Sequence, residues 1–85
     1  MTVVTEQTST DLVRFINREV SISPDPIEAE TDLLLTGAVD SLGVIRITQW
    51  MEDELGVTVD PADVTLDNFQ TVTQMVSYLA GRTAS

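Results

Sequence analysis

The chain has 85 residues, of which 42% are hydrophobic, and its 14 acidic residues against 4 basic ones give a formal net charge of −10. This length is sufficient for one small domain with a thin core. Because the sequence contains neither cysteine nor histidine, it excludes disulfides, thiolate nucleophiles, imidazole bases and the usual zinc sites. The negative charge repels nucleic acids and anionic lipids, so we expect protein partners with basic surfaces.

The first residues contain no basic segment followed by an apolar run, and no stretch elsewhere is long enough to span a bilayer. We therefore expect a cytoplasmic protein. We also expect a monomer that does not bind membranes. Residues 1–8 are rich in threonine and glutamine without periodicity and are predicted to form a flexible tail. Residues 9–81 are predicted to form the domain, and residues 82–85 a second tail.

The first predicted helix begins at Ser9 or Thr10, either of which is a competent N-cap. Apolar residues then recur at helical spacing. They are Leu12, Val13, Phe15, Ile16 and Val20. Two prolines in residues 21–26 end this helix, because each removes a backbone donor and favours an extended conformation in the residue before it.

A long loop connects this helix to the next one. Leu33, Leu34 and Leu35 are too apolar to remain in water. Part of the loop is therefore expected to lie across the end of the bundle, with a helical turn after Thr31 or Asp32.

The second predicted helix runs from Ser41 to Leu55 and ends at Gly56. At roughly 100° per residue, one stripe of this helix faces the core. The stripe consists of Val44, Ile47, Thr48, Met51 and Leu55. Leu42, Ile45 and Gln49 fall on the other side, while Trp50 lies between the two faces and either covers the core or belongs to an interface.

Residues 57–59 alternate like a strand but have no pairing partner, which predicts an extended linker. Asp60 and Pro61 then have the pattern of a cap and first residue of a short helical turn. The acidic residues in this region lack the spacing of a calcium loop, so no metal site is predicted. Thr71 and Gln74 form a predicted capping box, and Gly81 ends the last helix. The sequence thus predicts an all-α fold, a small bundle of three main helices plus one short helical turn.

Asp40-Ser41-Leu42 stands at the start of the second predicted helix. Asp40 is a good N-cap, which places Ser41 at the first helical position, near the positive end of the helix dipole. A phosphate ester on Ser41 would lie in a favourable field. Taken alone, an Asp-Ser pair of this kind only indicates a helix start.

Together with residues 37–45 and 50–57, this triplet resembles the acyl and peptidyl carrier protein family, whose signature is Asp-Ser-Leu at the start of the second helix. The resemblance extends from about Leu12 to Leu79 and is closest to free-standing members. It implies a non-catalytic carrier with the fold predicted above. It also implies that a phosphopantetheinyl transferase uses coenzyme A to attach 4′-phosphopantetheine to Ser41, between Asp40 and Leu42. The terminal thiol of this arm carries the cargo as a thioester.

Fatty-acid carriers usually have an acidic or polar residue after Asp-Ser-Leu and a second acidic residue a few positions on, whereas this chain has Gly43 and Arg46. Residues 39–46 look most like carriers of specialised pathways, such as polyketide, nonribosomal peptide or antibiotic biosynthesis. The resemblance implies loading by an adenylating ligase or acyltransferase and transfer to synthase enzymes. A fatty-acid-type carrier is the alternative within the family.

Two other classes of protein are compatible with a serine at a helix start. A hydrolase would use Ser41 as nucleophile, but there is no histidine to act as base, and neither Gly-x-Ser-x-Gly nor Ser-x-x-Lys is present. An acidic helical interaction module would leave Ser41 unmodified and bind a partner helix through Leu42 and Ile45.

Partners of a carrier are expected to dock on the second helix beside Ser41. The family resemblance points to this helix, and Leu42 and Ile45 support it because they are apolar but lie off the core stripe. Arg46 interrupts the acidic surface and is predicted to favour a partner with a carboxylate opposite it. The predicted docking residues are Leu42, Ile45, Arg46, Gln49, Glu52 and Asp53.

Overall fold

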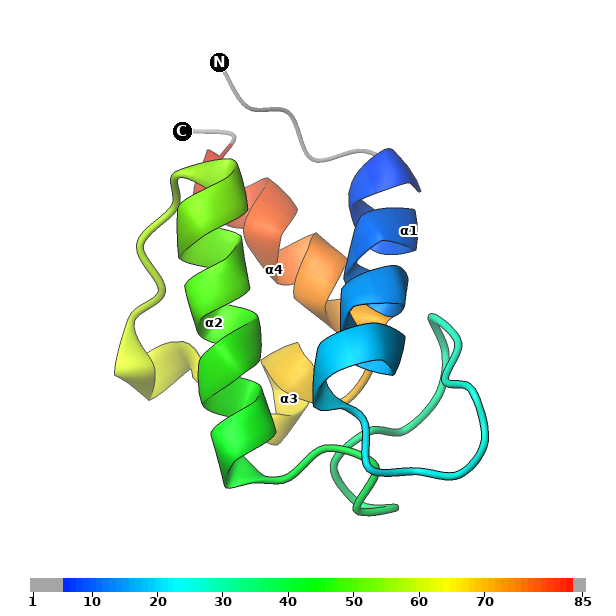
Figure 1. The fold of residues 1–85 in the computed structure, drawn as a ribbon. Coiled ribbons are helices and arrows are strands. Elements are labelled where there is room, and N and C mark those ends of the chain that lie inside the picture. Colours follow the sequence, from blue (N-terminus) through cyan, green and yellow to red (C-terminus); the bar gives the residue numbers. More distant parts are fainter. Residues whose placement is uncertain (1–5, 84–85) are drawn as a thin grey trace.

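A computed structural model describes residues 6–83, which form a helical bundle (Figure 1). The elements in chain order are α1 (Glu6–Phe15), the π-helical turn η1 (Ile16–Val20), α2 (Ser41–Leu55), the 3₁₀ turn η2 (Pro61–Asp63), α3 (Leu66–Phe69) and α4 (Val72–Thr83). Helix α2 begins at the end of the bundle opposite the start of α1. No strand occurs within residues 6–83, and the predicted all-α fold is confirmed.

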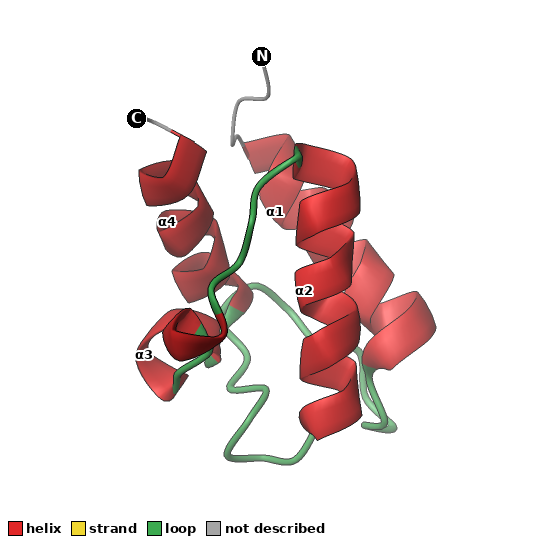
Figure 2. Ribbon diagram, turned by 90° about the vertical axis from the view of Figure 1, so that its left-hand side faces the viewer, coloured by secondary structure: helices red, strands yellow, loops and turns green. Residues whose placement is uncertain are grey.

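Two short helical pieces, and not one, lie between α2 and α4. The predicted turn is η2, where the Asp60 carboxylate accepts a hydrogen bond of 2.8 Å from the backbone N–H of Ala62. Helix α3 was not predicted, because a four-residue helix is too short to show periodicity. The linker after α2 descends to these two pieces (Figure 2), and α3 brings the fully buried Phe69 into the core.

The first and last helices are longer than predicted, α1 at its start and α4 at its end. Helix α1 begins at Glu6, before the predicted cap, and buries Thr8. Helix α4 continues through Gly81, and the guanidinium of Arg82 donates a hydrogen bond of 2.8 Å to the carbonyl of Thr58. Residues 6–8 and 82–83, expected in the tails, are therefore helical. The remaining tail residues, 1–5 and 84–85, lie outside the described part of the chain.

The core is built from α1, η1, α2, α3 and α4, together with the long loop and the linker after α2. It consists of Leu12, Ile16, Val20, Ile27, Leu33, Ala38, Val39, Ile47, Met51, Val59, Phe69, Val72, Met75 and Leu79. The predicted stripe of α2 is correct in direction, since Ile47 and Met51 are fully buried. Its other members are half-buried, which places them at the edge of the core.

Side-chain hydrogen bonds hold the loop of residues 21–40 against the bundle. The Asn17 side chain accepts from the N–H of Ile27 (2.8 Å) and donates to its carbonyl (3.1 Å). The N–H of Leu33 donates to the carbonyl of Gln70 (2.8 Å), and Leu33 is fully buried as expected. The expectation that this leucine segment is buried is wrong for Leu35, which is 71% exposed.

The predicted helical turn after Asp32 is also absent, because non-helical turns form there. The Asp32 carboxylate accepts from the N–H of Leu35 (2.9 Å), and the N–H of Gly37 donates to the carbonyl of Leu34 (3.2 Å). Gly37 has a φ of 77°, which favours glycine. This backbone path turns Leu35 outward while Leu33 stays in the core.

The predicted capping box starts α4. The N–H of Thr71 donates to the side-chain oxygen of Gln74, and the N–H of Gln74 donates to the hydroxyl of Thr71, both at 3.1 Å. Further along α4, the Tyr78 hydroxyl donates to the Asp63 carboxylate at 2.8 Å. Burial, and then this hydrogen bond to an anion, raise the pKa of the Tyr78 hydroxyl. The contact ties α4 to η2.

The first turn of α2 packs closely against its neighbours at Gly43, which is buried. A Cβ atom on Gly43 would lie 2.8 Å from the Cγ1 atoms of both Val20 and Val39. Both valines belong to the core, so neither can move aside freely. Gly43 thus lets the first turn of α2 approach the end of η1.

We predict that Gly43→Ala lowers the free energy of unfolding by about 1–2 kcal/mol, because overpacking outweighs the gain in helix propensity. The matched control is Gly81→Ala, since Gly81 also lies in a helix but has nothing within 4 Å of its Cβ position. Gly81→Ala should raise the free energy of unfolding by up to about 1 kcal/mol. Urea denaturation measures both changes, and equal stabilisation by the two substitutions would contradict the packing account.

Candidate functional site

The candidate site is built at the first turn of α2. Asp40 is extended, with φ −95° and ψ −175°, and its carboxylate accepts a hydrogen bond of 2.8 Å from the N–H of Gly43. Its carbonyl accepts from the N–H of Val44 at 3.0 Å. The predicted N-cap is therefore confirmed, and Ser41 is the first residue of α2.

Ser41 is exposed, and its hydroxyl makes no hydrogen bond with any residue in the range 6–83. The first turn of a helix also leaves backbone N–H groups without an intrahelical acceptor, and these carry partial positive charge. The hydroxyl is thus accessible for modification, and a negatively charged group attached to it would be stabilised by the helix end.

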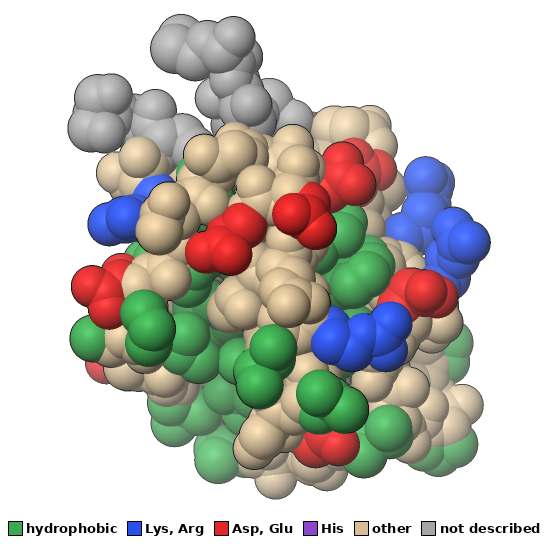
Figure 3. Space-filling model, turned by 60° about the vertical axis from the view of Figure 1, so that its left-hand side comes forward, with side chains coloured by type: hydrophobic (Ala, Val, Ile, Leu, Met, Phe, Trp, Pro, Cys, Tyr) green, Lys and Arg blue, Asp and Glu red, His purple; other side chains and the backbone are tan. Residues whose placement is uncertain are grey.

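An apolar pocket of about 390 Å³ opens beside the serine. The long loop, α2 and the segment around α3 each contribute to its wall. The lining residues are Leu34, Ser41, Val44, Ile45, Val64, Thr65, Leu66 and Phe69. Figure 3 shows hydrophobic side chains gathered on the lower part of a face whose upper part carries a row of acidic ones.

The pocket wall contributed by the loop depends on Asp32. One carboxylate oxygen accepts from the side-chain amide of Gln70 (2.9 Å), and the other from the N–H of Leu35 (2.9 Å). These two hydrogen bonds, the Gln70 bond first, lower the pKa of Asp32. Because the pKa of Asp32 is lower in the folded protein than in the unfolded chain, its ionised carboxylate stabilises the fold at neutral pH. This stabilisation is lost as the pH falls through the folded-state pKa.

Sequence reasoning missed Leu34, Val64 and Leu66 as residues of the site. They lie in the loop and next to short helical turns, where no periodicity signals which way a side chain points. The apolar character of these residues was the available signal in the sequence. The structure shows that Val64 and Leu66 are exposed although they are hydrophobic. Only the folded chain brings them next to Ser41.

Several predicted docking residues lie on the surface beside Ser41. Leu42 is 65% exposed and Ile45 is 54% exposed, as their position off the core stripe predicts. Gln49 and Asp53 are exposed as well, and neither side chain has a hydrogen bond or ion pair within the described range. These four residues are available to a partner.

Two other predicted docking residues have partners within the chain. Arg46 donates to the backbone carbonyl of Glu19, and its guanidinium lies 3.9 Å from the Glu19 carboxylate. Glu52 accepts a hydrogen bond of 3.0 Å from the N–H of Val59. These contacts could not be predicted from local sequence patterns, because each joins α2 to a residue on another element.

Among residues 6–83, no group of three or more acidic, histidine or cysteine side chains could hold a metal ion. No helix in the same range is long and apolar enough to cross a membrane.

A helical bundle with an exposed serine at a capped helix start is the arrangement that the resemblance to carrier proteins implies. A family model described as "Phosphopantetheine attachment site" matches residues 10–79. The chain therefore belongs to this family. No curated protein matches the chain.

A solved structure described as "Crystal structure of FAD-dependent dehydrogenase" contains a chain similar to this one. The TM-score is 0.72 and the sequence identity is 21%, covering 81% of this chain and 99% of that chain. At this identity the similarity shows the fold alone.

Domains of this family hold 4′-phosphopantetheine covalently, so 4′-phosphopantetheine is the cofactor of this protein, and the protein is a carrier. Carrier domains of this kind work with phosphopantetheinyl transferases and synthase-type enzymes, and they are generally non-catalytic.

We predict that Asp40→Ala lowers the free energy of unfolding by about 1 kcal/mol, because α2 loses its N-cap. Asp40→Asn is the matched control, since it removes the same charge but keeps an oxygen that caps the helix. Its stability should stay within a few tenths of a kcal/mol of the parent protein. Thermal and urea unfolding measure both, and equal losses would show that charge, and not capping, stabilises the helix start.

Proposed function

We propose that this protein carries a biosynthetic intermediate as a thioester on 4′-phosphopantetheine attached to Ser41. In this proposal the protein is itself non-catalytic and acts in the cytoplasm in a specialised pathway of the polyketide or nonribosomal peptide kind. An adenylating ligase or acyltransferase loads the arm with an amino or other small carboxylic acid. Synthase enzymes then receive the intermediate.

The observation that carries the proposal is the state of Ser41. It is the first residue of a long helix, it is exposed, and its hydroxyl is free of hydrogen bonds within residues 6–83. A transferase can reach this hydroxyl without disturbing the core. The absence of a hydrogen-bonded base also argues against a serine hydrolase.

The residues around Ser41 fit the cofactor. The unpaired N–H groups of the first turn favour a phosphate ester on the serine. The apolar pocket offers the pantetheine part of the cofactor a surface free of charged side chains. When bound, 4′-phosphopantetheine supplies the thiol that holds the cargo. The protein's own contribution is to fix the serine at the helix start through Asp40 and Gly43.

The proposed docking surface is the exposed side of α2 next to Ser41. Leu42 and Ile45 provide apolar anchors, and Asp53 provides a free carboxylate for a basic partner. Gln49 adds a polar contact between them. We propose that Glu52 and Arg46 act at the rim of this surface, where their contacts within the chain hold them in position.

We predict that Ser41→Ala abolishes modification without unfolding the protein, because alanine accepts the helical geometry but lacks the hydroxyl. The measurement is intact mass after incubation with coenzyme A and a broad-specificity phosphopantetheinyl transferase. Ser77→Ala is the control, since Ser77 is exposed on α4 and should not affect the reaction. The parent and control proteins should gain one phosphopantetheine group.

Normal modification of the Ser41→Ala variant would refute the site. A parent protein that gains no mass would instead indicate an interaction module with an unmodified serine. In protein purified from its native source, the mass of the thioester-bound group should correspond to an amino or other small carboxylic acid. A long fatty acyl group would identify a fatty-acid-type carrier.

We predict that Ile45→Ala slows phosphopantetheinyl transfer about three- to tenfold in kcat/KM, because it removes an apolar anchor. The change in unfolding free energy should stay below about 1 kcal/mol, since half of the side chain is already exposed. Ile22→Ala is the matched control, because Ile22 is 67% exposed but lies in the loop before α2. A loss of several kcal/mol for Ile45→Ala would place Ile45 in the core and refute the docking surface.

A further inference from the structure

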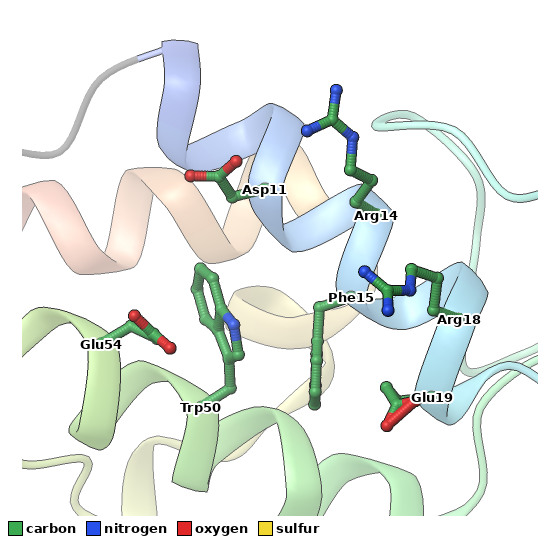
Figure 4. A pocket seen from close by; sticks show the side chains of 7 residues that line it. All are labelled: Asp11, Arg14, Phe15, Arg18, Glu19, Trp50 and Glu54. Atoms are coloured by element: carbon green, nitrogen blue, oxygen red, sulfur yellow. The ribbon is translucent and has the colours of Figure 1, made fainter.

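A second groove lies between α1 and α2, and none of its residues belongs to the site around Ser41. Its volume is about 500 Å³. The floor is a pair of half-buried aromatic rings, Phe15 from α1 and Trp50 from α2, stacked with centroids 5.8 Å apart (Figure 4). Trp50 therefore neither sits fully in the core nor belongs to the surface beside Ser41.

Hydrogen-bond donors line one end of the groove. Among residues 6–83, the guanidinium groups of Arg14 and Arg18 and the indole N–H of Trp50 make no hydrogen bond or ion pair. Figure 4 shows the Arg18 guanidinium beside Phe15, whereas Arg14 lies at the outer edge of the groove with its guanidinium pointing away from the aromatic pair. Glu19 also lines this end of the groove, and its carboxylate lies 3.9 Å from the guanidinium of Arg46.

The other end of the groove is acidic. Asp11 and Glu54 lie there, on the Trp50 side of the aromatic pair (Figure 4). Asp11 also accepts a hydrogen bond of 2.8 Å from the side chain of Gln7. The groove thus runs from a cationic end over an aromatic floor to an anionic end.

The groove faces away from Ser41. Trp50 follows Ser41 by nine residues in the same helix, which corresponds to about half a turn around the helix axis and about 13 Å along it. A partner seated on Phe15 and Trp50 therefore leaves the serine uncovered.

We propose that this groove is a second docking site, for a segment of a partner protein with an apolar side chain over the aromatic pair and carboxylates against Arg14 and Arg18. Carboxylates are the side chains that accept from arginine in a bidentate manner, so they are the groups that match the exposed guanidinium groups at this end. A basic residue of the same segment faces Asp11 and Glu54. This proposal does not depend on modification of Ser41.

Charge disfavours a second copy of the chain as the occupant. Each copy carries a net charge of −10, so that two copies repel each other. A partner segment with separated acidic and basic ends matches the groove without this repulsion.

The test selects binders from a random 12-residue peptide library on the unmodified parent protein, with counter-selection on the Arg14→Gln/Arg18→Gln variant. Binding of enriched peptides is then measured by the fluorescence of Trp50, the only tryptophan in the chain. Enriched peptides should contain an apolar residue beside Asp or Glu, and they should shift the Trp50 emission in a saturable manner. Loss of both arginines should weaken binding at least about tenfold, or about 1.4 kcal/mol.

A Ser77→Glu/Ala80→Glu variant is the matched control, because it also changes the net charge by two units but at exposed positions on α4. It should bind the peptides like the parent protein. Three outcomes would overturn the proposal. They are enrichment of purely basic peptides, equal binding by the parent and the arginine variant, and a concentration-dependent shift of Trp50 emission accompanied by dimer formation in sedimentation.

Discussion

The contact on which the rest of this structure depends is the packing of Gly43 against Val20 and Val39. It joins the end of η1, the end of the long loop and the first turn of α2 at a single point. Because a Cβ atom does not fit there, only glycine allows the first turn of α2 to pack this closely against the end of η1. The Asp40 cap then determines where the helix begins, and the two contacts together place Ser41 on the surface.

The long loop is the second element that the site requires. Its buried residues Ile27, Leu33, Ala38 and Val39 belong to the core, and polar contacts add to its ordering. Asn17 holds its first half and Asp32 its second half, through hydrogen bonds to backbone and side-chain groups. This ordering leaves Leu34 at the pocket beside Ser41 and exposes Leu35. The same segment therefore contributes both to the core and to the site.

The charges of the protein are unevenly distributed over its surface. Figure 3 shows a face on which a row of acidic side chains lies above apolar ones, with basic side chains toward the edges. Three of the four arginines, Arg14, Arg18 and Arg46, lie along the boundary between the first helix and α2. A strongly acidic chain thus places arginines next to its stacked aromatic pair, where acidic residues also line the groove.

The sequence alone determined those features that depend on neighbouring residues. The all-helical fold, the Asp40 cap, the capping box at Thr71 and the outward side of α2 at Ile45 follow from local spacing and were predicted correctly. Tertiary structure decided the features that join distant segments. The outward turn of Leu35, the pairing of Arg46 with Glu19, the pocket beside Ser41 and the aromatic groove result from packing between elements, which no local pattern records.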